Sequence, residues 1–298
     1  MYLYEDNKIE NVWVDQEAEP KNEKVGKLVR RSVNGNIKIG VKNKGNGFLK
    51  LLLGALLGLT VYAFVSFDYK NIDFGKAVSD TLHNIKTVFF EPALKRKTIL
   101  AVLQQLLLTF CLGALSTVFG AILAFFCSLL CAKNIANPVV ANVVKSLIAL
   151  VRAVPTVLWV LIFAVSAGLG SVAAVIGLTF HSFAYLTKVY AESIEETDAG
   201  TIEALKASGA NFWQIVFQAI LPASLSYIVA WTFMRFEINF TNAVAMGAAA
   251  GAGGIGFSLF MAGSFYFDLN EMGFLTYVVV IAVIILEFAS TKIKAAAK

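Results

Sequence analysis

Two arginines lie within long apolar runs of this sequence, where a charged side chain is costly. Arg235 is four residues before Asn239, which places the two side chains on one face of a helix, whereas Glu237 points elsewhere. Arg152 is three residues before Pro155, whose ring kinks a helix and frees backbone carbonyls. A guanidinium at the centre of a bilayer costs at least about 2.5–3.5 kcal/mol, so each arginine is expected to face protein or water.

Two interpretations of this polar set stay open. In the first, the arginines and Asn239 line a path and favour an anion in transit, because the guanidinium fork suits the geometry of oxyanions. In the second, Arg235 or Arg152 pairs with Glu237 and holds helices together. We favour the second, because a path that bound its cargo tightly would stall. The whole set, with Pro155, is kept as a candidate translocation path.

Four glycines close to one another form a second candidate set. Gly251, Gly253 and Gly256 satisfy G-x-G-x-x-G, the fingerprint of dinucleotide sites, and Gly254 lies between them. That fingerprint requires a preceding strand, a following helix and an acidic residue about 20 positions further on. Here the run follows a long apolar segment, so the sequence does not predict a nucleotide site. Glycines in a membrane protein more often permit close helix contacts or irregular backbone beside a cavity, and the four are candidates for the path.

The sequence predicts no catalytic residue and no metal ligand. Cys111, Cys127 and Cys131 lie in one apolar run, and His83 and His181 are far from them and from each other. The cysteines are expected to be packing residues. A membrane-embedded enzyme, one alternative, would need clustered acids, histidines or a nucleophile–base pair within the apolar runs. The chain has no phosphate-binding loop with its lysine, so any ATP hydrolysis must occur in another chain.

Composition indicates a helical protein that crosses a membrane several times. Of the 298 residues 58% are hydrophobic and 15% charged, and the mean hydropathy is +0.71. A span needs about 20 apolar residues. We expect an all-α fold with about six spans, a short amphipathic piece within the loop 68–97, and a loop at 258–272. The six expected spans are 48–67, 98–132, 143–167, 171–191, 215–240 and 273–290.

The basic residues predict the orientation of the chain. Residues 1–50 hold ten of the 25 lysines and arginines, and with both termini cytoplasmic the inner side carries sixteen and the outer side six. The basic triplet at 95–97 is the main exception. We expect the arm 1–47 to lie beside the membrane rather than on nucleic acid, and to be either a small hairpin turning at Asn34-Gly35 or a disordered arm. The first apolar run begins too late for a cleavable secretion signal.

The polar segment 192–214 predicts a short, stiff helix on a defined turn. Asp198 or Thr201 can cap a helix start by accepting a backbone N–H, and the following residues are good helix formers. Gly209 can adopt the left-handed conformation that ends a helix. Pro222 is expected to kink the helix that comes next. Such a piece can sit in a groove of a motor subunit and pass on its movement.

This segment resembles the cytoplasmic loop of binding-protein-dependent ABC importer permeases. The pattern of that loop is Glu-Ala-Ala, three residues, Gly, nine residues, Ile, one residue and Leu-Pro. Glu203, Ala204, Gly209, Leu221 and Pro222 fall in register with it. The resemblance implies that these five residues couple the chain to an ATPase, and that the fold is that of a type I ABC importer permease.

Two positions depart from the pattern, and further stretches narrow the family. Leu205 replaces the second alanine, and Ala219 stands at the isoleucine position with Ile220 one place late; all three are apolar. Over roughly 98–290 the chain is similar to phosphonate-type permeases. The stretches that carry this resemblance are 152–155, 188–192, 235–239 and 251–256.

The resemblance implies partners and a cargo. It implies a homodimer of permeases in the cell membrane, a cytoplasmic ATPase dimer that uses ATP and Mg, and an extracytoplasmic substrate-binding protein, with no cofactor bound by this chain and no nucleic acid. The cargo would be phosphonate, phosphite or phosphate. A permease for another small solute and a stand-alone secondary transporter are the alternatives. The expected division is a basic arm 1–47, a first span with external loop 48–97, a permease core 98–290 and a tail 291–298.

Overall fold

The structure is a computed structural model, and it describes residues 29–31, 37–39, 44–67 and 72–296. The chain divides into two units, Met1–Asp73 and Phe74–Lys298, and each is described by itself. The all-α fold with about six spans is confirmed: the described residues include five helices long and apolar enough to cross a membrane, or six if one bent pair counts as a span. Among the described residues, one pair of short strands accompanies the helices.

The first unit holds that strand pair and one long helix. Strands β1 (Val29–Arg31) and β2 (Ile37–Ile39) are antiparallel, with Val29 opposite Ile39. The pairing confirms the hairpin interpretation of this part of the arm, although its Asn34-Gly35 turn and most of 1–47 lie outside the described residues. Helix α2 (Lys44–Ser66) contains the first apolar run.

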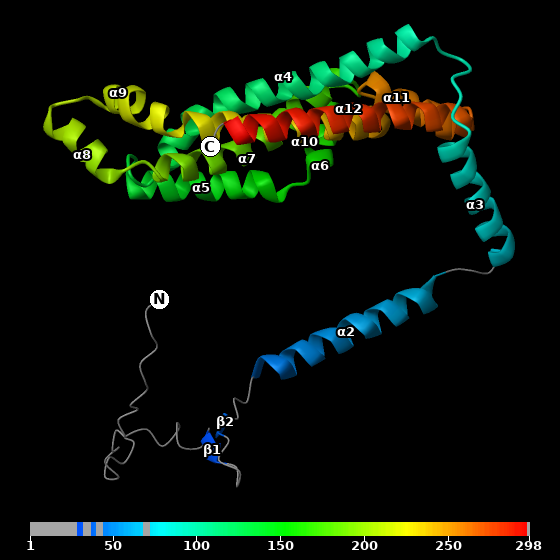
Figure 1. Cartoon of the computed structure of the whole chain (residues 1–298), viewed down its shortest axis with the longest axis horizontal. Coiled ribbons are helices and arrows are strands. Elements are labelled where there is room, and N and C mark those ends of the chain that lie inside the picture. The colour runs from blue at the N-terminus through cyan, green and yellow to red at the C-terminus, as the bar shows by residue number, and fades with distance from the viewer. Residues whose placement is uncertain (1–28, 32–36, 40–43, 68–71, 297–298) are drawn as a thin grey trace, which may run out of the picture. The chain divides into compact units, whose positions relative to one another are not determined.

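The second unit is a bundle of long helices together with shorter ones (Figure 1). The long helices are α4 (Ile99–Cys131), α7 (Ser171–Glu195), α10 (Leu221–Ala250) and α12 (Leu269–Ala296). The shorter elements are α3 (Phe74–Phe90), α5 (Pro138–Ala153), α6 (Thr156–Ala167), α8 (Ala199–Ala207), α9 (Phe212–Ile215), the π-helical turn η1 (Val216–Ile220), α11 (Gly254–Phe260) and the π-helical turn η2 (Met261–Phe265). The amphipathic piece expected within 68–97 is α3.

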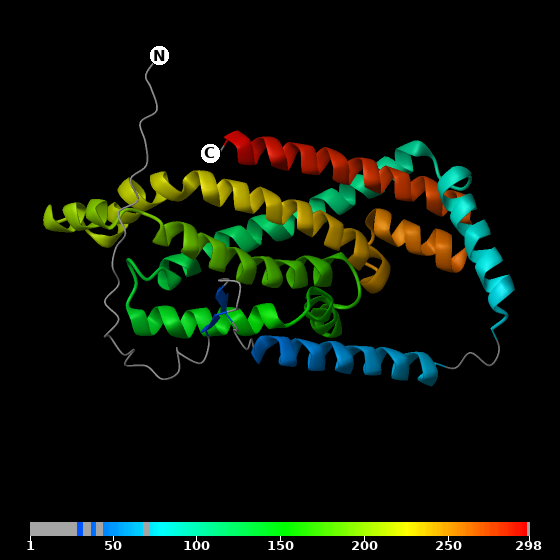
Figure 2. The same ribbon diagram turned by 60° about the horizontal axis from the view of Figure 1, so that its bottom comes forward.

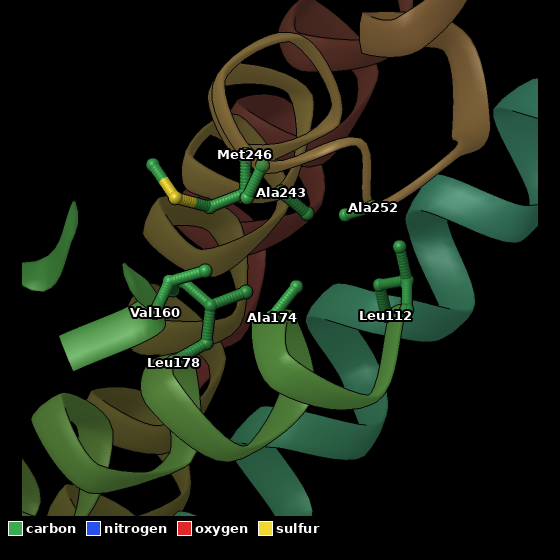
Figure 3. Close-up of a cluster of buried hydrophobic side chains, with 8 residues drawn as sticks. Leu112, Val160, Ala174, Leu178, Ala243, Met246 and Ala252 are labelled. Carbon is green, nitrogen blue, oxygen red and sulfur yellow. The ribbon is translucent and has the colours of Figure 1, made fainter. Parts of the chain in front are cut away.

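Helix α7 is the most buried of the candidate spans and packs against α4, α6 and α10. Small side chains let these helices approach closely, as is usual for helices within a membrane. Figure 3 shows one cluster where they meet beside the turn that follows α10. The labelled side chains of that cluster are Leu112, Val160, Ala174, Leu178, Ala243, Met246 and Ala252.

The third expected span, 143–167, is not one helix. Helices α5 and α6 meet at an angle of 86°, so that α6 turns across the direction of α5 (Figure 2). Pro155 lies at the break, where it has no N–H to donate and disfavours helical backbone in the residue before it. The indole Nε1 of Trp159 donates to the carbonyl of Val151 at 3.0 Å, which satisfies one backbone group freed by the break.

The expected loop at 258–272 is corrected too, because Gly254–Phe265 is helical. Helix α10 continues to Ala250, a glycine-rich turn follows it, and α11 begins at Gly254 and packs against α10 and α4. Ile255 and Ala262 are buried against Val102 and Leu275, so the segment has an apolar face to bury. That face favours a helix over the predicted loop.

The basic triplet at 95–97 is held by the beginning of α12 and by α11. Lys95 and Arg96 lie 3.8 and 4.0 Å from the carboxylate of Asp268, and Lys97 Nζ donates to Ser258 Oγ at 2.6 Å. Much of the charge that made this triplet an exception to the expected orientation is therefore engaged by neighbouring side chains.

Candidate functional site

Helix α8 projects beyond the end of the long helices, between α7 and α9 (Figures 1 and 2). Its N-cap is Asp198, whose carboxylate accepts hydrogen bonds from the backbone N–H of Thr201 at 2.8 Å and from the Thr201 hydroxyl at 3.0 Å. These two bonds lower the pKa of Asp198 below its ordinary value. Of the two cap candidates in the sequence, Asp198 is the cap and Thr201 is its donor.

The other end of α8 closes on Gly209, which has a φ of +84°. A β-branched residue resists this left-handed conformation, whereas glycine adopts it freely. The next helix begins two residues later with a capping box, in which Asn211 Oδ1 accepts from the N–H of Gln214 at 2.9 Å and Gln214 Oε1 from the N–H of Asn211 at 2.7 Å. Both helix ends at this turn are therefore fixed by the sequence.

The kink expected at Pro222 takes the form of a wide helical turn. Directly before it, in η1, the N–H of Leu221 bonds to the carbonyl of Val216. A proline has no N–H and clashes with the carbonyl one turn earlier, and a π-helical turn accommodates that clash without ending the helix. Phe212–Ala250 therefore forms one continuous candidate span.

One side of α8 is anchored to the bundle and the other is exposed. Ile202 is 2% exposed and packs with buried residues of α7, α9 and η1. Glu203, Ala204 and Gly209 are exposed, Leu221 is half-buried, and Pro222 is exposed. The five motif residues thus lie on the projecting helix, its closing turn and the start of α10, where a partner could reach α8.

A buried polar cluster joins α4, α7 and α10. Asn239 is fully buried, and its Nδ2 donates to Thr117 Oγ1 at 2.8 Å and to Ser182 Oγ at 2.7 Å. Arg235 is 2% exposed, its Nε donates to Ser182 Oγ at 3.1 Å, and its guanidinium lies 5.3 Å from the ring centre of Tyr185. The expected shared face of Arg235 and Asn239 is confirmed by their common partner.

Glu237 was expected to pair with Arg235 or Arg152, and the described structure does not show this pair. Among the ion pairs of the described residues, none joins Arg235 or Arg152 to that half-buried acid. The contacts of Arg235 are instead a neutral hydroxyl and an aromatic ring. Its Nη2 atom is buried without a hydrogen-bond partner, as is Oδ1 of Asn239. The guanidinium therefore keeps a donor and an unneutralised charge within the bundle.

His181 is a member of this region that the sequence did not single out. It lies one residue before Ser182 on α7, close enough to Arg235 and Arg152 to interact with them electrostatically, and its Nδ1 atom is buried without a hydrogen-bond partner. Arg152 itself is exposed at the end of α5, and Pro155 is exposed at the break. The missing information was the 86° bend, across which both α5 and α6 pack against α7.

The four glycines lie at the turn after α10 and in the first residues of α11. Gly251, Gly253 and Gly254 have φ values of +61°, +80° and +70°. A Cβ on Gly256 would lie 1.8 Å from the carbonyl oxygen of Val244, so α11 can pack against α10 only with glycine there. These positions serve irregular backbone and close helix contact, as expected, and a helix precedes them where a nucleotide fingerprint needs a strand. Within the described part of the chain, no group of three or more His, Cys, Asp and Glu could hold a metal.

Comparison with known families identifies the family of this chain. Residues 116–294 match the family of binding-protein-dependent transport system inner membrane components. The match covers more than half of the chain, and the protein belongs to this family. It is a multi-pass membrane component of a transport system.

Curated relatives have names from phosphorus transport and from amino-acid transport. The phosphate-import permease protein PhnE of Mycolicibacterium smegmatis is 32% identical over 153 residues, which are 51% of this chain and 29% of the relative. The phosphite transport system permease protein PtxC of Stutzerimonas stutzeri is 35% identical over 147 residues, 49% of this chain and 52% of the relative. A probable D-methionine transport system permease protein of Pasteurella multocida is 26% identical over 159 residues, 50% of this chain and 73% of the relative. The chain spans about half or less of the length of the first two relatives.

Solved structures share the fold. A chain of the MetNI methionine ABC transporter in an inward-facing conformation superposes with a TM-score of 0.62 at 24% identity, over 69% of this chain and all of that chain. A chain of an amino acid ABC transporter superposes with a TM-score of 0.53 at 17% identity, over 76% of this chain. The type I ABC importer permease fold is thereby confirmed.

Proposed function

We propose that this chain is the membrane-spanning subunit of an ATP-driven importer for a phosphorus oxyanion, such as phosphonate, phosphite or phosphate. The observation that carries the proposal is α8, a capped helix that projects from the bundle of a transport-family member on a left-handed glycine turn. A helix fixed at both ends can transmit the motion of a motor subunit to α7 and α10. Glu203, Ala204 and Gly209 on this segment, with Leu221 and Pro222 behind it, are the proposed coupling residues.

The names of the relatives support a phosphorus oxyanion as the cargo, and the buried positive charge of Arg235 is suited to an anion. The relatives from M. smegmatis and S. stutzeri are named for phosphate import and phosphite transport. The unpartnered Nη2 of Arg235 could offset part of the desolvation of an anion, since a guanidinium suits oxyanion geometry. Methionine is the competing cargo, because other relatives are named for D-methionine transport.

The proposed assembly contains two copies of this chain, a cytoplasmic ATPase dimer that uses ATP and Mg, and an extracytoplasmic binding protein. Cargo selection rests mainly with the binding protein, and the path supplies a weak positive bias. The four-part division of the chain, with both termini and α8 in the cytoplasm, belongs to the same proposal.

Assembly with the ATPase tests the function. The chain purified alone should neither hydrolyse ATP nor move solute in liposomes, whereas the complex with its ATPase should do both. Robust uptake by the lone chain, driven by an ion gradient, would instead identify a secondary transporter.

Cysteine labelling tests the orientation. In a background without the three native cysteines, Lys206→Cys on α8 should react with an impermeant reagent only in opened cells, and Lys86→Cys on α3 should react in intact cells. Both side chains are exposed, so access alone decides the result. Labelling of position 206 from outside would overturn the proposed topology and coupling role together.

A further inference from the structure

A cavity of about 390 Å³ opens between α5, α7 and the segment that follows α4. It lies at the α8 end of the bundle, because its lining reaches the last residue of α7, only a few residues before the cap of α8. Its charged lining side chains are Lys133, Lys145, Arg152, Lys188, Glu192 and Glu195. Helix periodicity explains the arrangement, since residues three, four and seven apart share a face on both α5 and α7.

Both carboxylates of the cavity are already engaged. Glu195 Oε1 lies 2.8 Å from Lys145 Nζ and also accepts from the backbone N–H of Lys133 at 2.9 Å. Glu192 lies 3.5 Å from Lys188. Four cationic side chains face two carboxylates, so the cavity has an excess of two positive charges.

The excess charge is carried by groups that have donors to spare. Arg152 and the ammonium of Lys133 form no ion pair among the described residues. A guanidinium offers a planar fork of N–H donors that matches a phosphate-type anion, and a nearby ammonium adds a point charge. The volume lies within the usual range for a small-molecule site, about 300–1,000 Å³.

We propose that this cavity binds a phosphate-type oxyanion, held mainly by Arg152 with Lys133 and Lys145. The site is distinct from the buried Arg235 cluster, whose contacts come from Ser182 and Tyr185 instead. The same chemistry could be supplied by a free phosphorus oxyanion or by the headgroup phosphate of an anionic lipid. That the ligand is a free oxyanion rests on the proposed function. The positive charge of the cavity is an observation that does not depend on that function.

Equilibrium dialysis of the full chain with radiolabelled inorganic phosphate tests this site. In nanodiscs of zwitterionic phosphatidylcholine we expect saturable binding that Arg152→Gln and Lys133→Gln each weaken about tenfold. Lys86→Gln is the matched control and should leave the affinity unchanged. Lys86 is an exposed lysine paired with Glu91, and it lies on α3, at the opposite end of the bundle from α8 (Figure 1).

Replacing part of the lipid with anionic phosphatidylglycerol separates the two sources. If phosphatidylglycerol competes with phosphate, and mass spectrometry finds it retained by the parent chain but not by Arg152→Gln, the cavity holds a lipid headgroup. If phosphate binding is unaffected, the ligand is the free oxyanion. Absence of both saturable phosphate binding and Arg152-dependent lipid retention would overturn the site.

The result of the phosphate-binding experiment is independent of the test of ATP-driven uptake. Loss of the site would leave the proposed importer function standing, since no transport is measured in the dialysis. A phosphate site in a chain that shows no ATP-driven uptake would leave the cavity standing and remove the importer function.

Discussion

The hydroxyl of Ser182 accepts a hydrogen bond from the side-chain amide of Asn239 at 2.7 Å, and this bond joins α7 to α10 where both residues are fully buried. Ser182 donates its own hydrogen to the carbonyl of Leu178 at 2.6 Å, so its oxygen is free to accept from Asn239 and from Arg235. The second hydrogen of the amide goes to Thr117 on α4. One asparagine therefore connects three helices of the bundle.

Asn239→Leu should destabilise the bundle by roughly 1–2 kcal/mol, because each lost hydrogen bond contributes about 1 kcal/mol and two buried hydroxyls each lose one donor. The measurement is thermal unfolding in detergent, followed by tryptophan fluorescence. Asn242→Leu, three residues on in the same helix, is the control and should shift the midpoint little. Equal shifts for both variants would show that the cluster has no special part in stability.

Arg235→Gln should slow uptake of methylphosphonate by the reconstituted complex while the subunits still co-purify. Glutamine keeps a polar side chain but removes the charge that would offset the desolvation of an anion. Arg235→Lys should restore part of the rate if charge alone suffices, and little if the guanidinium fork matters. Loss of assembly in Arg235→Gln would identify the residue as a structural pin instead.

Gly209→Val should uncouple ATP hydrolysis from transport while the amount of protein in the membrane stays near normal. A left-handed backbone costs a non-glycine residue about 1–3 kcal/mol, so valine should shift the turn after α8. Gly209→Asn is the matched variant, because asparagine tolerates this conformation, and it should retain most of the activity. Normal coupling in the valine variant would contradict the role of the turn.

The cap of α8 should respond to acid but not to changes near neutral pH. Because the pKa of Asp198 is lowered in the folded chain, the charged cap stabilises α8 above the ordinary value of 3.8 and is lost as the pH falls through the lower folded value. A spin label at position 206 should therefore be equally ordered at neutral and mildly acidic pH and become mobile only in stronger acid. Asp198→Ala should make it mobile at every pH, and mobility that changes near neutral pH would point to another group.

Local chemistry explains which parts of this structure the sequence could predict. The cap at Asp198, the turn at Gly209 and the shared face of Arg235 and Asn239 each depend on residues within one or two helical turns. The side-chain types and the spacing of these residues were enough to predict the cap, the turn and the shared face. The same holds for the apolar runs, whose length alone indicates spans.

Features that depend on contacts between distant segments could not be predicted in this way. The segment 258–272 was expected to be a loop, but Gly254–Phe265 is helical, and its buried face is defined by distant residues such as Val102 and Leu275. The partners of Arg235 come from α7, 50 or more residues earlier, and no local pattern marks Ser182 as an acceptor. The bend at Pro155 was expected as a kink, but its size depends on how α6 packs against α7.

We propose that this chain carries a phosphorus oxyanion through the membrane when an ATPase drives it. The most direct measurement is uptake into proteoliposomes that hold the complete complex, with labelled methylphosphonate and labelled methionine offered in parallel. We predict uptake of methylphosphonate that needs both ATP and the binding protein, with no uptake of methionine. ATP-driven uptake of methionine, or uptake of methylphosphonate without the ATPase, would contradict the account.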